Sequence, residues 1–191
     1  KGYQIHIHQN GDGGLDYLLD ILEKNLKRNP RDDHRTTIVH FGYSRSNQIP
    51  RIKELGAIVS ANPYYITVLS ELYSSVGVGY ARSQEMVRLG DLEDNIVTFA
   101  LHSDMPMAPA SPLQLMSSAV NRLNIANKVA GPNQRIEVMN ALKAVTINAA
   151  YVLGLEEDYG TISSGKFANI TILDKNPFNI DKNSISDIKV I

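Results

Sequence analysis

The chain has 191 residues, enough to bury a hydrophobic core, and 43% of them are hydrophobic, as in globular proteins. Its 19 basic and 20 acidic residues leave a formal net charge of −1, and like charges are not grouped into blocks. The sequence therefore lacks the charge pattern of proteins that bind nucleic acid or anionic membranes. It also contains no cysteine, which excludes disulfides, thiolate metal ligands and thiol catalysis.

No apolar run approaches the roughly 20 residues that a membrane-spanning helix needs, and no signal-peptide pattern opens the chain. We therefore expect a cytoplasmic protein that acts on a small-molecule substrate, without nucleic acid or a membrane as a partner. The first residue is Lys1 rather than methionine, and strand-like sequence begins almost at once, at Tyr3. On these grounds we expect the chain to be a fragment of a longer protein.

Strand-like and helix-like segments alternate along the first 153 residues. The predicted strands are residues 3–8, 36–41, 57–61 and 97–101. The predicted helices are residues 15–26, 49–55, 66–73, 82–89, 112–121 and 135–153. This alternation indicates an α/β fold with a parallel sheet.

The number of strand–helix units is half of what a closed barrel contains. A complete TIM-type (β/α)8 barrel needs about 250 residues, so we interpret residues 1–157 as the second half of such a barrel. The composition changes at residues 159–166, where glycines suit turns between short strands. Residues 170–174 and 188–191 are predicted to be strands of another kind. We therefore expect residues 158–191 to form a small β segment outside the barrel.

Three predicted strands end at residues that can bind a metal ion. His8 and His40 close the first two, and Asp104 follows the fourth, which Pro106 prevents from continuing. The strands of a parallel barrel end on one face, so these side chains are expected to converge. Imidazole and carboxylate are ligands of Zn²⁺, which lowers the pKa of bound water so that a carboxylate can take its proton. A single histidine at a strand end is more often a hydrogen-bonded polar residue than a metal ligand. With three strand ends that carry His8, His40 and Asp104, a metal site and ordinary hydrogen bonding both remain open.

Four segments carry a resemblance to a known family. Residues 4–12, 35–40 and 101–113 resemble the amidohydrolase superfamily, and residues 160–177 resemble its closing segment. The similarity is greatest to amidohydrolase family 3, whose members are often described as metal-dependent hydrolases or exoenzyme regulatory proteins. The match covers nearly the whole chain in the right order. It implies that residues 158–191 are C-terminal strands of a small β-sandwich shared with the N-terminus of the family.

The resemblance also implies roles for individual residues. His8 and His40 correspond to the metal-binding histidines that end the fifth and sixth barrel strands. Asp104 corresponds to the aspartate of the eighth strand, which contacts the metal and acts as general base on the hydrolytic water. The intact protein is accordingly expected to use one or two divalent metal ions, zinc above all.

Further residues are candidates for supporting roles. Asp12 matches the acidic residue after the fifth strand, which supports a ligand or caps the next helix. Arg82 lies where the family often has an arginine that faces substrate, and a solvated helix charge is an equal alternative. His102 is expected to share a strand face with the aspartate two positions later, and to orient substrate or a ligand. His6 is expected to support the first metal histidine, and His34 to be exposed.

The chain departs from the family pattern in what it lacks. The first-strand His-x-His pair and the bridging lysine or carboxylate of the fourth strand are absent from this sequence. His8, His40 and Asp104 supply at most three ligands from one side. We therefore expect the 191-residue chain alone to bind metal weakly and to be catalytically inactive.

Two functions of different classes remain open. The first is a metal-dependent hydrolase that acts on amide, other C–N or ester bonds. The second is a catalytically inactive half-barrel whose exposed strand edges pair with a second copy, as a homo-oligomer, or with the missing half. A phosphate-binding barrel is disfavoured, because no glycine-rich loop follows the last strands.

Overall fold

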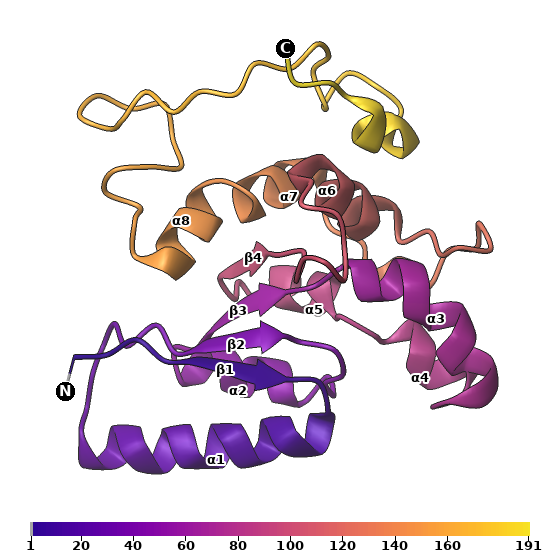
Figure 1. The fold of residues 1–191 in the computed structure, drawn as a ribbon. Coiled ribbons are helices and arrows are strands. Elements are labelled where there is room, and N and C mark those ends of the chain that lie inside the picture. Colours follow the sequence, from indigo (N-terminus) through magenta and orange to yellow (C-terminus); the bar gives the residue numbers. More distant parts are fainter. Residues whose placement is uncertain (1) are drawn as a thin grey trace.

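The structure, a computed structural model, describes residues 2–191 and is built on one sheet of four parallel strands. The strands are β1 (His6–Gln9), β2 (Thr37–His40), β3 (Ile58–Ala61) and β4 (Phe99–Leu101), paired in the order β1-β2-β3-β4. Strands β1 to β3 point toward the side where α3 and α4 lie (Figure 1). The predicted parallel α/β fold is therefore confirmed.

The helices follow the strands closely in sequence. They are α1 (Asp12–Arg28), α2 (Gln48–Glu54), α3 (Tyr64–Val76), α4 (Tyr80–Gln84), α5 (Leu89–Asp94), α6 (Pro112–Asn121), α7 (Val138–Ala144) and α8 (Ile147–Leu153). Two short 3₁₀ helices, η1 (Pro132–Gln134) and η2 (Lys182–Asp187), complete the set. No helix within residues 2–191 is both long and apolar enough to cross a bilayer.

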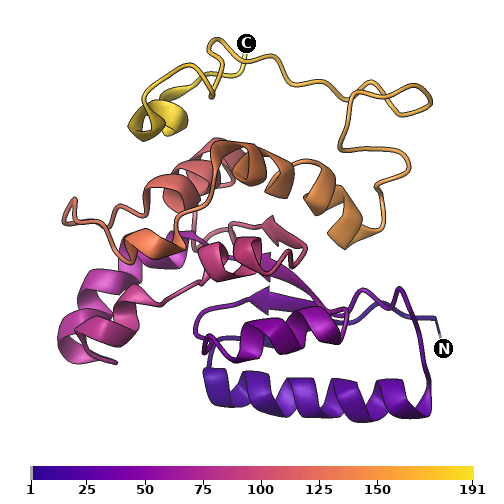
Figure 2. The same cartoon turned by 180° about the vertical axis from the view of Figure 1, so that it is seen from behind.

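One face of the sheet carries the main hydrophobic core. Ile7, Ile38 and Val59 project toward it, and leucines of α1 at helical spacing pack into the same cluster. Seen from behind, α2 lies over the strands and α1 runs along the β1 edge (Figure 2). The opposite face remains open at β1, where His6 and His8 are exposed.

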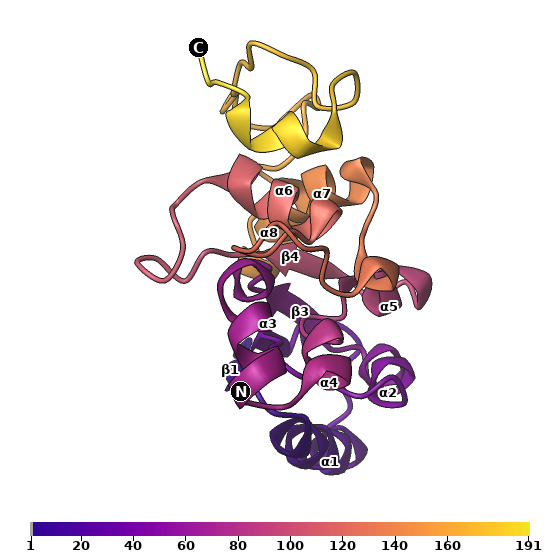
Figure 3. The ribbon, with the colours of Figure 1, turned by 90° about the vertical axis from the view of Figure 1, so that its right-hand side faces the viewer.

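The end of the sheet where the strands finish is bordered by α3 and α4. Figure 3 looks toward this end, with these two helices nearest the viewer, α1 at the bottom and the C-terminal segment at the top. Helices α6, α7 and α8 lie on the β4 side, between the sheet and the C-terminal segment (Figure 1). The strand ends are therefore flanked by helices rather than closed over.

The prediction of a helix over residues 82–89 was wrong. Two short helices, α4 and α5, occupy this region, and Val87 between them has a left-handed backbone with φ of 48°. A β-branched residue in that conformation cannot continue an α-helix. The side chain of Arg122 binds the carbonyl oxygens of Met86 and Val87, and so holds this break in place.

The prediction of one helix over residues 135–153 was also wrong in its continuity. The segment forms α7 and α8, separated at Thr146, whose φ of −125° and ψ of −98° are not helical. The β-branched run Val145-Thr146-Ile147 has low helix propensity. Asn148 then donates a hydrogen bond to the carbonyl oxygen of Phe99, which directs α8 onto β4.

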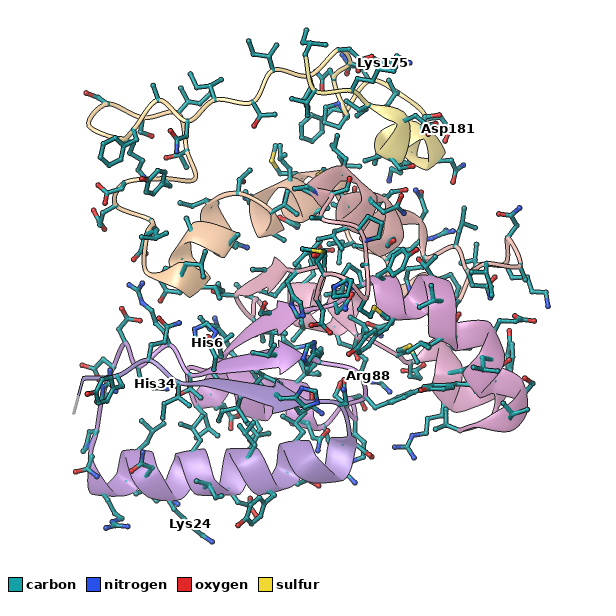
Figure 4. All side chains as sticks on the ribbon, viewed as in Figure 1. His6, Lys24, His34, Arg88, Lys175 and Asp181 are labelled. Atoms are coloured by element: carbon teal, nitrogen blue, oxygen red, sulfur yellow. The ribbon has the colours of Figure 1, made fainter. Side chains whose placement is uncertain are left out.

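The strands predicted at residues 170–174 and 188–191 are not formed within the described part of the chain. A single antiparallel bridge joins Leu173 to Val190 there. Ile170 and Ile172 are 60% and 59% exposed, so the alternating apolar side chains have no layer to pack against. Lys175 and Asp181 also project from this segment, at the top of the molecule (Figure 4). The β-sandwich is not seen in this structure.

A fully buried arginine joins the end of α4 and the segment after it to the segment that follows α6. The guanidinium of Arg122 donates to the carbonyl oxygens of Ala130 at 2.6 Å, Met86 at 2.8 Å, Val87 at 3.0 Å and Gln84 at 3.2 Å. Its planar fork can serve several acceptors at once, which a lysine ammonium cannot. These hydrogen bonds fix the position of residues 84–87, which pass beside the end of β2.

We expect Arg122→Ala to lower the free energy of unfolding by about 3–5 kcal/mol, because removing the donor leaves buried carbonyl groups unpaired. Arg122→Lys is expected to recover only part of this loss. Lys24 projects from α1 away from the sheet (Figure 4), so Lys24→Ala is the control and should change stability by less than about 0.5 kcal/mol. Urea denaturation followed by circular dichroism measures all three. Equal free energies of unfolding for Arg122→Ala and Lys24→Ala would contradict the structural role of Arg122.

Candidate functional site

Three histidines and one aspartate meet where the strands end. We call His8, His40, His102 and Asp104 the strand-end cluster. The ring centroids of His8 and His40 lie 4.5 Å apart, and those of His40 and His102 lie 4.9 Å apart. His40 Nδ1 lies 3.8 Å from a carboxylate oxygen of Asp104. The structure thus brings together four of the six predicted site residues, from positions remote along the chain.

The backbone of His40 is what brings its ring into the cluster. Regular alternation from Ile38, a core residue, would turn His40 toward the helix-covered face. His40 instead has φ of 73°, and Phe41 follows with φ of 57°. Left-handed backbone at two successive non-glycine residues is costly and is concentrated at functional sites. The imidazole of His40 therefore faces His8, on the open side of the sheet.

Asp104 reaches the cluster by a turn rather than by strand alternation. Strand β4 ends at Leu101, and Asp104 lies in the following turn with φ of 52°. The prediction that His102 and Asp104 share one strand face was therefore wrong. Both still point at His40, because the turn folds the carboxylate back toward the strand ends.

Hydrogen bonds connect and orient the rings. His102 Nε2 and His40 Nδ1 are 3.0 Å apart, so one of the two rings supplies the proton between them. The other nitrogen of His102 lies 2.9 Å from the hydroxyl of Ser60. The amide nitrogen of Asn10 lies 3.1 Å from His8 Nε2. Each imidazole therefore has at least one partner that limits its rotation.

Burial keeps the inner rings neutral. Burial, helped by the neighbouring His40 and opposed by Asp104, lowers the pKa of His102 to about 4. The pKa of His40 is lowered as well, again by burial, against the attraction of the Asp104 carboxylate. Neutral imidazole beside a carboxylate is the form in which these groups bind a metal ion.

Asp12 and Arg82, predicted as supporting residues, contact each other. The guanidinium of Arg82 donates to the Asp12 carboxylate at 2.6 Å and lies 5.5 Å from the ring centroid of Tyr43. Asp12 is the first residue of α1 rather than its cap, since Gly11 holds the cap position without a side-chain bond. Arg45 Nη1 is 3.9 Å from the same carboxylate. These charges thus form an ion-pair group close to the N-terminus of α1.

The two remaining histidines lie away from the cluster. His6 and His34 are both found toward the end where the strands begin (Figure 4). The expectation that His34 is exposed was wrong, since it is 5% exposed. Its Nε2 lies 2.8 Å from the carbonyl oxygen of Leu55, at the C-terminus of α2, and its Nδ1 accepts from the backbone N–H of Thr36. His34 therefore satisfies a helix end rather than facing solvent.

Sequence reasoning missed three neighbours of the cluster. Asn10 and Ser60 hydrogen-bond to cluster rings, and the ring of Tyr65 stacks on His40 with centroids 6.1 Å apart. The available signal was their position, because Asn10 follows His8 by two residues and Ser60 lies near the end of a predicted strand. Tyr65 had no comparable signal, since it belongs to a helix whose orientation only the fold decides.

The donor chemistry of the cluster fits a divalent metal ion, although its present geometry is that of a hydrogen-bonded group. Within residues 2–191, no three His, Asp or Glu side chains are already arranged to hold an ion. Two imidazoles and a carboxylate are nevertheless the donors that zinc takes in catalytic sites. Their individual roles as ligands stay a prediction.

The fold and the cluster define a parallel α/β protein whose strand ends gather imidazole and carboxylate groups. The model of amidohydrolase family 3 matches residues 1–191, and the chain belongs to this family. The resemblance that the sequence motifs indicated is therefore confirmed.

Individual relatives agree with this assignment. The chain is 27% identical over 193 residues to N-substituted formamide deformylase of Arthrobacter pascens, covering 100% of this chain and 35% of that protein. An uncharacterized metal-dependent hydrolase from Pyrococcus furiosus is similar in structure, with a TM-score of 0.76 and 30% identity, over 93% of this chain and 35% of that one. A second, from Pyrococcus horikoshii OT3, has a TM-score of 0.78 and 28% identity, over 95% and 36%. The chain thus spans about a third of the length of these relatives.

We expect the stability of the metal-free protein to fall as the pH is lowered from 6.5 to about 4. In this range the unfolded chain protonates residue 102, whereas the folded protein holds His102 neutral, so protons favour unfolding. His102→Gln is expected to reduce this dependence. Urea denaturation at several pH values with a chelator present measures both proteins. If the variant lost as much stability as the wild type over this range, the burial of His102 would not be its cause.

Proposed function

We propose that this chain carries one side of the divalent-metal site of a hydrolase that acts on amide or other C–N bonds, with esters as a related substrate class. The observation that carries this proposal is the meeting of His8, His40 and Asp104 at one edge of the sheet. Membership of the amidohydrolase family and similarity to metal-dependent hydrolases support it. We propose zinc as the metal.

Each residue has a distinct part in the proposed chemistry. His8 and His40 would hold the ion through ring nitrogens, and Asp104 through a carboxylate oxygen. A bound zinc ion would supply a Lewis acid that polarises the substrate carbonyl and acidifies water. The side chain of Asp104 is 47% exposed, so it can reach a water molecule and accept its proton as general base. His102 orients the ring of His40 through their shared hydrogen bond.

We further propose that the four strands are half of a TIM-type barrel. Within the described residues, β1 and β4 each pair on one side only, and the sheet face that carries His8 is open. Both features are those of a barrel wall that is not closed. In such a barrel, Asp12 and Arg82 would lie at the rim, where the half-exposed guanidinium of Arg82 can face substrate. Residues 158–191 would then add to a small β-sandwich.

We expect zinc to bind to the wild-type chain and to bind at least about tenfold more weakly to His8→Ala, His40→Ala and Asp104→Asn. The expectation follows because loss of even an outer partner of a ligand costs about 10–100-fold in metal affinity. Isothermal titration calorimetry with zinc chloride measures the affinity and the stoichiometry. His6→Ala is the matched control, since His6 lies two residues before His8 on the same strand.

The proposal fails if none of the three variants changes zinc binding, or if His6→Ala weakens it as much as His8→Ala does. We also propose that the 191-residue chain by itself does not turn over substrate, because the described residues offer three donors from one side. Amine release from an N-substituted formamide, with and without added zinc, tests this part. Zinc-dependent turnover by the chain alone would overturn the claim of inactivity and support the hydrolase assignment.

We also propose a second function, self-association through the open strand edges. The outer edge of β1 has no strand partner within residues 2–191, and Ile5 beside it is 48% exposed. An unpaired edge next to exposed apolar groups favours pairing with another chain.

We expect the wild-type chain to form dimers or larger species in size-exclusion chromatography with light scattering. Ile5→Lys is expected to shift it toward the monomer, because a lysine on an edge opposes strand pairing. Ile21→Lys is the matched control, since Ile21 on α1 is 49% exposed and lies on the helix rather than the edge. A monomeric wild-type chain would exclude this second proposal.

A further inference from the structure

Tyr65, in the first turn of α3, contacts the strand-end cluster, and the chemistry proposed above gives it no part. Its ring stacks on the imidazole of His40, with centroids 6.1 Å apart and planes inclined by 21°. Stacked rings at centroid distances of about 4.5–7 Å attract each other and prefer defined relative orientations. The contact therefore restricts the plane in which the two nitrogens of His40 lie.

Backbone hydrogen bonds attach the start of α3 to His40 itself. The backbone N–H of Asn62 donates to the carbonyl oxygen of His40 at 3.0 Å. The side-chain oxygen of Asn62 accepts from the backbone N–H of Tyr64 at 3.1 Å, and Asn62 is fully buried. An asparagine in this arrangement fixes the turn that follows it. The segment that joins β3 to α3 therefore holds Tyr65 in place relative to His40.

The hydroxyl end of Tyr65 is linked to the other histidine of the proposed metal site, His8. Burial raises the pKa of Tyr65, and a side-chain hydrogen bond with Asn10 opposes that rise. The amide nitrogen of Asn10 in turn lies 3.1 Å from His8 Nε2. Tyr65 thus contacts His40 directly and His8 through a single amide group.

The chain after β2 limits where the side chain of Asn10 can lie. The carbonyl oxygen of Asn10 accepts from the backbone N–H of Tyr43 at 3.0 Å. A Cβ added at Gly42 would lie 2.7 Å from Asn10 Oδ1, so this amide occupies the space that a side chain at position 42 would need. The amide is therefore bounded on one side by the segment that follows β2.

A cavity of about 220 Å³ lies next to the cluster, since Asn10 and Tyr65 both line it and both contact a cluster ring. The rest of its wall consists of Gly42, Tyr43, Leu69, Tyr73 and Met86. Because this space is open, close packing alone does not fix the side chain of Tyr65, and its contacts with His40 and Asn10 contribute to its placement.

We propose that Tyr65 is a positioning residue for the metal site: its ring sets the plane of His40, and its hydroxyl, through Asn10, sets the orientation of His8. This deepens the proposed function and rests on it only in calling the two histidines metal ligands. Outer groups that orient the rings of metal ligands contribute about 10–100-fold to metal affinity. The contacts themselves are features of the metal-free chain.

The test compares Tyr65→Phe, which keeps the ring and removes the hydroxyl, with Tyr65→Leu, which removes both. Long-range ¹H–¹⁵N spectra of the imidazole rings, recorded on the 191-residue chain with a chelator present, report the surroundings of each ring nitrogen. We expect Tyr65→Phe to shift the signals of His8 and to leave those of His40 near their wild-type positions. Tyr65→Leu is expected to shift both sets, and Asn10→Ala those of His8.

Tyr64→Phe and Tyr64→Leu are the matched controls, since Tyr64 precedes Tyr65 on the same helix and is half-buried as well. They are expected to leave both histidines unchanged. Ring signals that do not respond to Tyr65→Leu, or that respond equally to Tyr64→Leu, would overturn the proposal. Signals of His8 that stay in place in both Tyr65→Phe and Asn10→Ala would overturn the link through the amide.

One measurement needs no substitution, and it decides the stacking even if Tyr65→Leu does not fold. In the wild-type chain we expect nuclear Overhauser effects between the ring protons of Tyr65 and those of His40. Their absence would overturn the claim that the tyrosine ring sets the plane of this imidazole.

Zinc titration calorimetry supplies the second readout. Tyr65→Leu is expected to bind zinc at least about tenfold more weakly than the wild type, in line with the loss of an outer partner. Tyr65→Phe keeps the stacking and is expected to recover part of that loss, while both Tyr64 variants bind as the wild type does. Equal zinc affinities for Tyr65→Leu and a zinc-binding wild type would overturn the positioning role.

This proposal and the metal-site proposal fail separately, because the ring spectra need neither metal nor turnover. If the wild type binds no zinc and the ring signals respond as expected, the metal-site proposal falls and Tyr65 still positions the two histidines. If zinc binds as expected and the ring signals do not respond to substitutions of Tyr65, the positioning role falls and the metal-site proposal remains.

Discussion

The register of the parallel sheet is the constraint on which the site depends. Gln9 is paired with His40, and His40 with Ala61, so neighbouring strands finish at the same level. Because all four strands run in one direction, whatever follows each of them is delivered to one edge. Groups that lie far apart along the chain therefore become neighbours at that edge. The cluster and the cavity beside it are consequences of this alignment.

Local backbone strain then selects which side chains face one another. His40 and Asp104 both adopt left-handed conformations, and without them the imidazole would turn into the core and the carboxylate would follow the strand direction. The surrounding packing stabilises this arrangement. Val87, another left-handed residue, donates its N–H to the carbonyl oxygen of Gly42, beside the end of β2. Arg122 binds the carbonyl of Val87 from the other side, so a buried charge far along the chain supports the region around the site.

The cluster and the cavity beside it are two different kinds of surface. Polar groups with neutral imidazoles lie at the strand ends, while an uncharged aromatic hollow lies beside them. Asn10 and Tyr65 belong to both, since each contacts a cluster histidine and lines the hollow.

The sequence by itself determined the parallel α/β class, the positions of the strands and the family, because alternation, turn residues and short motifs are local properties. It also indicated His8, His40 and Asp104, since the two histidines close predicted strands and the aspartate follows one. Only the tertiary structure decided that His40 turns to the open face, that Tyr65 stacks on it, and that residues 82–89 and 135–153 break into shorter helices. The turn of His40 depends on left-handed backbone, and the break within residues 82–89 depends on left-handed Val87 and on the buried Arg122, whose acceptors lie up to 38 residues away. Contacts over such separations leave no period in the sequence, so folding alone reveals them.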